Sequence, residues 1–430
     1  MGRMFIRPLV LLLLIALAAV GCSERETNPF DPASDTEGPV VTNFVYSGGE
    51  ATWSTNEDAL SVLEYGPVGG EYLRYVYEST KYHSTFHRVR LLGMEEGEEY
   101  VVRVRSVDRA GNESYENAVG LPDTLAGYAF AGETMRLGMV DVGWGLSMAL
   151  TTPDGSNVLI DAGYDAKLDD VLGFLDEANI DAFDAVVVTH YHADHYGGLG
   201  SYEPGDEEDG VLNRFTIGAF CCPDTTDLYR EIPGSLLAKA ARYLIPVTCI
   251  KQGDTSESVD ALDWDDTPGF DVTVLAAGLG GAMMAVDDSG EEGMNTNNDS
   301  VVLMIRFGDV EVITTGDAEH FSEYDIVTTF GRDALDADFL QVGHHGSDDS
   351  SSELWLDNVR PRVAFISCAM VEAALEKEEV LQGLRAVDSD YFVTDRIFPN
   401  TSRNDSPTYG NLIMVTDGES IEIELDPDPH

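Results

Sequence analysis

The densest group of chemically active side chains lies in residues 189–199, which read THYHADHYGGL. It brings His190, His192, Asp194 and His195 together within six residues at the end of an apolar run. Such groups need polar partners once they are buried, so they would be costly as ordinary core residues. Imidazole and carboxylate donors suit divalent ions, with zinc first and manganese or iron as alternatives. We therefore predict that the first two histidines hold one metal ion, while Asp194 and His195 face a second.

The elements around this motif predict a mixed α/β domain over residues 129–425. The apolar run 185–188 predicts a buried strand directly before the motif. Further strands are expected at 135–141 and 157–161, and the apolar spacing over 169–179 predicts an amphipathic helix. The alternation of strands with helical segments favours a sheet that is covered by helices.

Residues 38–122 have a different sequence pattern. Short runs in which apolar and polar residues alternate are separated by turn residues, which predicts a small β-sandwich. The expected strands are 40–41, 51–54, 61–65, 87–92 and 100–106. Trp53, the turn 95–99, Tyr100 and the run 108–112 together resemble a fibronectin type III domain, which implies that Tyr100 is its corner tyrosine. The sandwich is expected to act as a spacer or to dock a protein or polymer.

The N-terminal segment has the pattern of an export signal. Its apolar run 9–17 follows two arginines and is too short to span a bilayer. The small residues after it, followed by Cys22, resemble a bacterial lipobox, which implies that residues 1–21 are removed and Cys22 is lipidated. An ordinary secretory peptide is the alternative. Residues 22–37 would form a flexible tether, and the mature protein would be extracytoplasmic and held to a membrane only by its lipid.

The composition excludes some classes of partner. The chain has 430 residues, 43% of them hydrophobic, with 25 Lys+Arg against 78 Asp+Glu and a formal net charge of −53. These values fit a globular protein without long-range affinity for nucleic acid. A phosphodiester could still bind at short range, because two divalent ions outweigh distant carboxylates. Cys221, Cys222, Cys249 and Cys368 could form disulfides outside the cytoplasm or remain free thiols.

The pattern His-x-His-x-Asp-His is the signature of the metallo-β-lactamase superfamily, and six more segments narrow the resemblance. They are DVGWG at 141–145, LIDAG at 159–163, NDSVV at 298–302, TGDAE at 315–319, VGHHGS at 342–347 and RPRVAFIS at 360–367. In this order they resemble the extracellular hydrolase domain of ComEC-type competence proteins and its free-standing relatives, over roughly residues 134–425. The resemblance implies an αββα sandwich with a dinuclear metal site at one edge.

Further roles follow from this resemblance. Asp317 should bridge both metal ions. One histidine of the pair His344 and His345 should complete the second site. We favour His345 as that ligand, with His344 free to contact substrate or donate a proton. Asp141 and Asp161 either orient the ligand histidines or the nearby loop, or cap turns at strand ends.

The sequence also departs from the superfamily. True metallo-β-lactamases and glyoxalase-like members place another metal-binding histidine between the motif and the bridging carboxylate. No histidine occurs between His195 and His320 in this chain. The first ion would therefore have only His190, His192 and Asp317, which leaves room for water and a substrate oxygen. This open site argues against β-lactamase or glyoxalase activity.

The implied reaction is metal-assisted hydrolysis, in which two cations lower the pKa of a bridging water and the resulting hydroxide attacks the substrate. We expect Asp194 and His344 to be catalytic. A small or polymeric phosphodiester is the favoured substrate. The alternatives are hydrolysis of a lactone or carboxylic ester by the same ions, or an inactive surface binding protein. Nuclease activity is in doubt, because the segment after Ser367 lacks an Asn-Tyr-Gly-His-Pro-like run.

Overall fold

The structure is a computed structural model. It describes residues 35–116, 121–224, 233–279, 284–286, 292–294, 296–368, 377–394 and 410–425. The expected signal segment, Cys22, most of the tether and the run that follows Cys368 lie outside the described residues. Within the described ranges, no helix has the length and apolar character needed to cross a membrane.

The N-terminal part is a β-sandwich. Its strands are β1 (Val41–Ser47), β2 (Glu50–Pro67), β3 (Arg74–Glu78), β4 (Ser84–Arg90), β5 (Glu99–Asp108), β6 (Glu113–Glu116) and β7 (Leu125–Ala126). The first half of β2 pairs with β1 and β4, and its second half pairs with β3 and β5. One long strand therefore serves two small sheets, which pack around a core that contains Trp53 and Tyr65. The expected all-β character is confirmed, whereas the type III assignment stays a prediction.

The predicted corner tyrosine lies at the start of β5. Its hydroxyl accepts a hydrogen bond from the backbone N–H of Glu95 at 3.0 Å. This contact fastens the preceding turn to the strand, which is what a corner tyrosine does. The sequence pattern missed β3 and β6, because neither run is bounded by clear turn signals on both sides.

The α/β part begins at β8 and its first half covers the motif. The elements are β8 (Met135–Met139), β9 (Ser147–Thr151), β10 (Asn157–Ala162), α1 (Leu168–Glu177), β11 (Ala182–Val187), α2 (Ala193–Tyr196), β12 (Tyr202–Glu203), β13 (Asp206–Glu207), α3 (Val211–Arg214), β14 (Thr216–Pro223), α4 (Gly234–Arg242) and β15 (Val247–Ile250). The short helix after the motif begins at Ala193, earlier than the expected start near Gly197. The acidic stretch 203–210, expected as a plain loop, contains the β12–β13 hairpin.

The second half of the α/β part contains the other sheet with its helices, and its last two strands join the first sheet. Its elements are β16 (Phe270–Ala276), β17 (Met284–Val286), β18 (Glu292–Met294), β19 (Val302–Phe307), β20 (Val310–Thr314), α5 (His320–Phe330), α6 (Arg332–Leu335), β21 (Phe339–Gln341), α7 (Glu353–Val359), β22 (Val363–Ile366), α8 (Lys377–Ala386), β23 (Asp390–Val393), β24 (Leu412–Thr416) and β25 (Ser420–Leu425). The segment 286–293, also expected as a loop, contributes to the β17–β18 pair.

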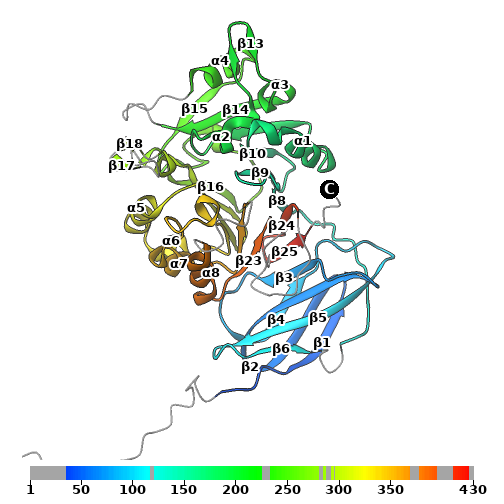
Figure 1. Ribbon diagram of the computed structural model, residues 1–430. Helices are drawn as coiled ribbons and strands as arrows, with labels where there is room; N and C mark the ends of the chain where they lie inside the picture. The colour runs from blue at the N-terminus through cyan, green and yellow to red at the C-terminus, as the bar shows by residue number, and fades with distance from the viewer. Residues whose placement is uncertain are drawn as a thin grey trace, which may run out of the picture.

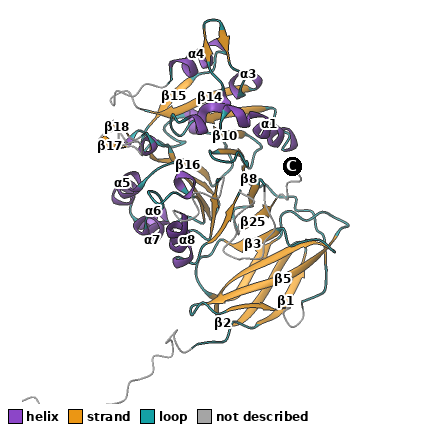
Figure 2. Ribbon diagram, in the orientation of Figure 1, coloured by secondary structure: helices purple, strands orange, loops and turns teal. Residues whose placement is uncertain are grey.

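Two sheets face each other in this part, with helices on their outer faces (Figures 1 and 2). One runs β15-β14-β11-β10-β9-β8-β24-β25, and the other runs β16-β19-β20-β21-β22-β23. A buried apolar cluster with members from both sheets fills the space between them. Separate clusters pack α1 and α4 on the first sheet and α5, α7 and α8 on the second. Buried strands such as β22 are apolar throughout because both of their faces are covered. The predicted αββα sandwich is confirmed.

The β-sandwich is joined to the α/β part by main-chain pairing. Strand β25 pairs with β3, so one sheet continues from the α/β part into the sandwich (Figure 1). Tyr75 and Tyr77 of β3 belong to the central core cluster. The fully buried carboxylate of Glu422 accepts hydrogen bonds from the Tyr65 hydroxyl at 2.7 Å and from Arg74 at 2.8 Å. The sandwich therefore packs against the core of the α/β part.

Candidate metal centre

The candidate site forms where strands of both sheets end. The His-rich motif follows β11. Asp161 is the second-last residue of the neighbouring parallel strand β10. Across the sandwich, Asp317 follows β20 and the histidine pair 344–345 follows β21, and these two strands are also parallel. Because carboxyl ends of neighbouring parallel strands meet at one edge, segments far apart in the sequence converge there.

The predicted ligands fall into two donor groups that share one carboxylate. The first group holds His190, His192 and Asp317, and the second holds Asp194, His195, Asp317 and His345. Within each group one ligand atom from every residue lies within 4.8 Å of the others. The structure thus brings together all six residues predicted as metal ligands, and places Asp317 between the two groups.

Distances within the groups suit a cation in each. His190 Nε2 lies 3.0 Å from His192 Nδ1. Asp317 Oδ2 lies 3.1 Å from His195 Nε2 and 3.4 Å from His345 Nε2. The two imidazoles of the first group are hydrogen-bonded to each other, whereas His195 Nε2 and His345 Nε2 approach the shared carboxylate without a hydrogen bond.

Three buried atoms of the site have no hydrogen-bond partner: His195 Nε2, His345 Nε2 and Asp317 Oδ1. A buried polar atom without a partner typically costs ~1–3 kcal/mol, and such atoms are rare in folded proteins. All three belong to the second donor group, where a divalent cation would satisfy them together. The donor set of imidazole nitrogens and carboxylate oxygens therefore fits metal ions of the zinc class.

Neighbouring groups orient the second-group histidines. His195 Nδ1 donates to Asp161 Oδ2 at 2.7 Å, and the same carboxylate accepts from the backbone N–H of Thr189 at 2.8 Å. His345 Nδ1 donates to the carbonyl of Ser367 at 3.2 Å. With Nδ1 engaged in this way, each ring turns its Nε2 atom toward the site, as metal-binding histidines usually do.

The two candidate orienting aspartates have different surroundings. Asp161 contacts a ligand histidine directly, as described above. The Asp141 carboxylate instead accepts from the backbone N–H of Gly143 at 3.1 Å, and its own N–H donates to Asn411 at 2.9 Å. Asp141 thus shapes the turn that leads to Trp144.

Burial and neighbouring charges shift the pKa values of the first-group histidines, His190 and His192, in the opposite direction from that of His195 in the second group. Burial, with the neighbouring imidazoles, lowers the pKa of His190 well below its ordinary value, and burial lowers the pKa of His192. Both histidines therefore favour the neutral form that binds metals. Burial opposes protonation of His195 as well, but the carboxylates of Asp317 and Asp161 outweigh it and raise its pKa well above the usual range. The second pocket is thus the more negative one, and it attracts positive charge.

Backbone strain is concentrated in the two segments that present these groups. His344 and His345 have φ angles of 45° and 55° in the left-handed region. Non-glycine residues rarely adopt this conformation and persist there only where the surroundings enforce it. Gly316, before the bridging carboxylate, has a φ of +55°, and a Cβ atom on it would lie 2.7 Å from Thr189 Cβ. The glycine lets the Asp317 turn approach the motif closely.

His344 lies at the margin of the two donor groups and belongs to neither. Its Nδ1 atom lies 2.8 Å from Asp349 Oδ1, whereas its Nε2 lies 4.0 Å from Asp317 Oδ2. The side chain is 23% exposed. Burial lowers the pKa of His344, but hydrogen bonding to Asp349 and the charge of Asp317 outweigh this and raise it to about 9. Of the adjacent histidines, the structure brings His345 into the metal cluster and leaves His344 at its margin.

Sequence reasoning missed the polar network around His344. Glu319 accepts hydrogen bonds from the side-chain amides of Asn297 at 2.8 Å and Asn298 at 2.9 Å. Asn298 opens one of the segments that carry the family resemblance, so a signal for it existed. Asp349 lies in a run of Asp and Ser residues, and nothing in that run distinguishes it from a surface loop.

Aromatic side chains surround the site in two ways. Tyr191 and Tyr196 pack against the apolar cluster under the first sheet, which agrees with the packing role that their positions in the motif suggest. Trp144 is 38% exposed, and its ring centroid lies 5.4 Å from that of His345. It therefore forms part of the accessible wall of the site.

Comparisons with known proteins agree with the fold. Residues 142–203 match the model of the Metallo-beta-lactamase superfamily. ComE operon protein 3 of Bacillus subtilis (strain 168) is 25% identical over 247 residues, which cover 53% of this chain and 28% of that protein. Anti-Pycsar protein Apyc1 of Bacillus phage vB_BsuM-Goe3 is 35% identical over 95 residues, covering 20% of this chain and 32% of that protein.

Among solved structures, a diphosphatase from the PhnP family aligns over 58% of this chain and 91% of that chain, with a TM-score of 0.32 and 14% identity. The chain spans 28% or less of the length of ComE operon protein 3, the Haemophilus influenzae recombination protein 2 and the Neisseria gonorrhoeae competence protein ComA. The likeness to the metallo-β-lactamase superfamily model covers residues 142–203, the segment that supplies four of the candidate metal ligands, His190, His192, Asp194 and His195.

Proposed function

We propose that this chain is an extracytoplasmic, lipid-anchored dinuclear metallohydrolase that cleaves phosphodiesters. The observation that carries the proposal is the pair of donor groups that meet at Asp317, with buried nitrogen and oxygen atoms left unpaired between them. A site that served only packing would not leave these atoms without partners.

His190, His192 and Asp317 would hold one ion, and Asp194, His195 and His345 would hold the other together with the same bridging carboxylate. Two divalent ions, with zinc favoured, would supply an activated water and stabilise negative charge on the transferred group. The protein itself fixes the ligand nitrogens of His195 and His345 through Asp161 and the Ser367 carbonyl, and burial keeps the histidine ligands of the first ion neutral.

Three features support a phosphodiester as the substrate. The first donor group has only three residues, which leaves positions for water and a substrate oxygen. His344 lies beside the site and is placed to donate a proton to a leaving group. Trp144 offers an exposed aromatic face next to His345, on which a base or another planar group could stack.

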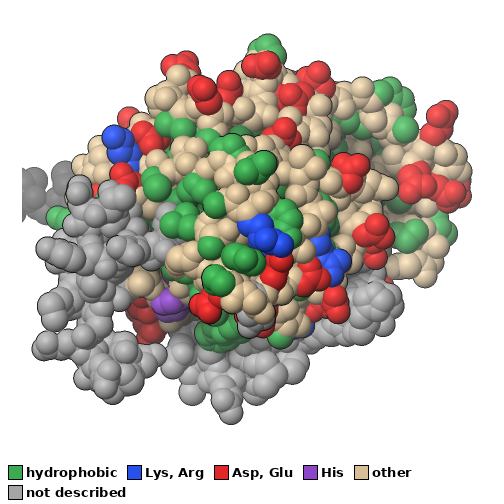
Figure 3. All heavy atoms as spheres, turned by 90° about the horizontal axis from the view of Figure 1, so that it is seen from above, with side chains coloured by type: hydrophobic (Ala, Val, Ile, Leu, Met, Phe, Trp, Pro, Cys, Tyr) green, Lys and Arg blue, Asp and Glu red, His purple; other side chains and the backbone are tan. Residues whose placement is uncertain are grey.

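The negative charge of the surface disfavours some kinds of substrate. Asp and Glu side chains are scattered over the face seen in Figure 3, with few Lys and Arg side chains among them. This distribution disfavours a long polyanion that must lie along the surface. We therefore favour a small diester, or the end of a polymer, that reaches the two ions locally.

The cellular setting is proposed from the apolar run 9–17 and Cys22. The sandwich is proposed to dock a protein or polymer near the membrane, with its rigid attachment through β25 fixing its orientation toward the site.

The test is metal content by mass spectrometry together with hydrolysis of bis-(p-nitrophenyl) phosphate by the chain from Ser23 onward. We expect about two metal ions per chain and turnover that is lost in Asp194→Ala. The matched control is Asp169→Ala, which removes an exposed carboxylate from helix α1. Two ions with turnover of lactones or carboxylic esters in place of phosphodiesters would favour the alternative hydrolase. A chain that binds no metal after reconstitution would contradict the enzyme proposal and leave the binding protein.

A further inference from the structure

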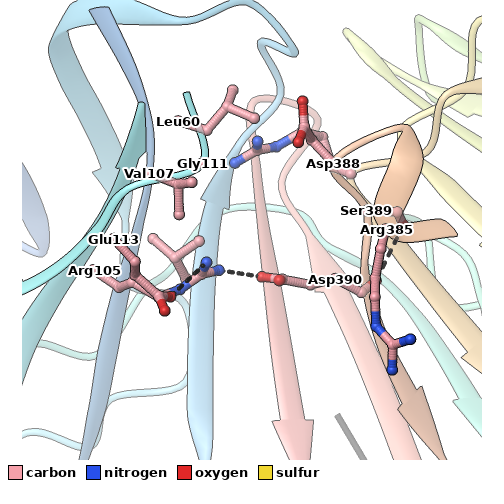
Figure 4. A pocket seen from close by; sticks show the side chains of 11 residues that line it. Leu60, Arg105, Val107, Gly111, Glu113, Arg385, Asp388, Ser389 and Asp390 are labelled. Atoms are coloured by element: carbon pink, nitrogen blue, oxygen red, sulfur yellow. Dashed lines mark hydrogen bonds and ion pairs between the residues drawn. The ribbon is translucent and has the colours of Figure 1, made fainter. Parts of the chain in front are cut away.

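A cavity of about 310 Å³ lies where the β-sandwich meets the α/β part, away from the metal centre. The sandwich contributes Leu60 and Val107 to its lining, and the α/β part contributes Asp388 (Figure 4) and Arg362. Arg362 directly precedes β22, and Ser367, which holds His345, directly follows that strand. At ~3.3 Å per residue the two ends of this stretch are roughly 16 Å apart, so the cavity and the metal centre are separate sites.

Arg362 is buried in the wall of this cavity without an ionic partner. The residue is 6% exposed, and its Nε atom has no hydrogen-bond partner. Its guanidinium lies over the Tyr77 ring, 5.6 Å from the centroid, and one Nη atom makes a long contact of 3.5 Å with the Ser61 carbonyl. Throughout the part of the chain that the structure describes, no carboxylate forms an ion pair with it.

The other buried arginine of the cavity, Arg105, has carboxylate partners, although its Nε atom also lacks a hydrogen bond. Arg105 pairs with Asp390 and, at 3.3 Å, with Glu113, as the dashed lines in Figure 4 show. Asp390 also accepts a hydrogen bond from the Tyr77 hydroxyl at 2.9 Å. These neighbouring carboxylates are therefore paired with other donors, and Asp390 acts on Arg362 through its charge without forming an ion pair with it.

A buried charge without a partner costs several kcal/mol. The chain has 78 acidic residues against 25 basic ones, so a shortage of carboxylates does not explain the arrangement. Burial also lowers the pKa of Arg362, which agrees with a guanidinium that is poorly compensated within the protein. A ligand that brings its own negative charge would remove this cost.

We propose that the cavity binds a small organic molecule that carries a single carboxylate, and that Arg362 receives this carboxylate. The planar guanidinium matches a carboxylate through two parallel hydrogen bonds. Leu60, Val62 and Val107 provide an apolar wall for the rest of the ligand. Glu113 and Asp388 also line the cavity, and their charges disfavour a dianion such as phosphate. The volume lies at the lower end of the range of small-molecule sites.

The test is calorimetric titration of the full chain, loaded with zinc, with acetate, butyrate and benzoate at constant ionic strength. Butyramide, which has nearly the same shape as butyrate without its charge, and inorganic phosphate serve as comparisons. In Asp194→Ala, which impairs the metal centre, we expect saturable binding of at least one carboxylate to persist, no binding of butyramide or phosphate, and a rise in melting temperature with the carboxylate that binds. Absence of carboxylate binding, or equal binding of butyramide, would overturn the proposal.

Two variants locate the binding. Arg362→Met should weaken carboxylate binding at least about tenfold, as expected for the loss of a charged hydrogen-bonded pair. Arg306→Met is the matched control, because Arg306 does not line the cavity and pairs with Glu311 at 3.3 Å, and it should leave the affinity unchanged. Binding that survives Arg362→Met, or that disappears in Asp194→Ala, would assign the carboxylate to another site and refute the proposal.

Discussion

His344 Nδ1 lies 2.8 Å from Asp349 Oδ1, and this contact holds the imidazole outside both donor groups. The next residue, His345, turns its Nε2 atom to within 3.4 Å of Asp317 Oδ2. Both residues share the left-handed backbone. The strained turn therefore gives two adjacent imidazoles different positions. His345 lies among the candidate metal donors, and His344 lies at the partly exposed margin of the site.

This difference predicts different defects for two variants. His345→Ala should lose the second metal ion and with it the activity, because it removes one of the four donors of that group. His344→Ala should keep both ions and lower kcat by a factor on the order of 10²–10⁴, the usual contribution of a positioned proton donor. Metal content and turnover measured on the same samples distinguish the two. Equal metal loss in both variants would mean that the roles assigned to the pair are wrong.

The second prediction concerns Asp161, whose carboxylate accepts a hydrogen bond from His195 Nδ1. Asp161→Asn should weaken metal binding by a factor on the order of 10–100, because the orienting partner of a ligand histidine is altered. Asp141→Asn is the control, since Asp141 holds the N–H of Gly143 and forms no hydrogen bond to a ligand histidine among the contacts of the described chain. Competition with a chromophoric chelator measures both affinities. If the two variants lose affinity equally, the distinction between an orienting carboxylate and a turn residue fails.

The sequence predicted the site better than it predicted the assembly of the two parts. The residue types and spacing of the motif alone suggested metal ligands, whereas the roles of Asp317 and of the histidine pair came from the family resemblance. The choice between His344 and His345 depends on backbone angles near +50°, which nothing in the letters GHHG specifies. Asp349 could not be predicted, because its role arises from a loop that folds back across the site.

The junction between the sandwich and the first α/β sheet was not predicted either, because local sequence does not specify which distant strands pair. The strand pattern of β25 predicts a buried strand, but its partner β3 is more than 300 residues away in the sequence. Glu422 in that strand has an ordinary alternating position, and only the three-dimensional fold shows that its carboxylate is buried against Tyr65 and Arg74. Long-range pairing of this kind leaves no local signal.

Glu422 gives the third prediction. Glu422→Gln should lower the free energy of unfolding by about 3–5 kcal/mol, because the buried carboxylate shared by the Tyr65 hydroxyl and the partly buried Arg74 would be lost. The control is Glu424→Gln, which removes a partly exposed carboxylate that contacts the same arginine at 2.7 Å and should cost about 1 kcal/mol or less. Chemical unfolding followed by tryptophan fluorescence tests both. A single transition in the wild-type chain is also expected, since β25 joins the two parts, and two well-separated transitions would contradict that coupling.

The last prediction is a pH dependence of stability that arises at Asp338. This carboxyl group is buried; Oδ2 accepts the backbone N–H of Glu311 at 2.9 Å, while Oδ1 has no hydrogen-bond partner. Burial raises the pKa of Asp338 from 3.8 to about 7. The native state therefore binds a proton that the unfolded chain releases between these values, so the contribution of Asp338 to stability is full below pH ~4 and is lost as the pH rises through ~7.

Asp338→Asn removes this titration and keeps the side chain neutral at every pH. Relative to the wild type, the variant should gain stability between pH ~5 and ~8, by no more than about 4 kcal/mol for a shift of this size. Any fixed cost of the amide adds the same offset at each pH, so the change in the difference is what matters. Urea unfolding of both proteins across this range measures it. A difference that stays constant with pH would show that Asp338 is ionised in the native state throughout, and that the carboxyl group is solvated better than its burial implies.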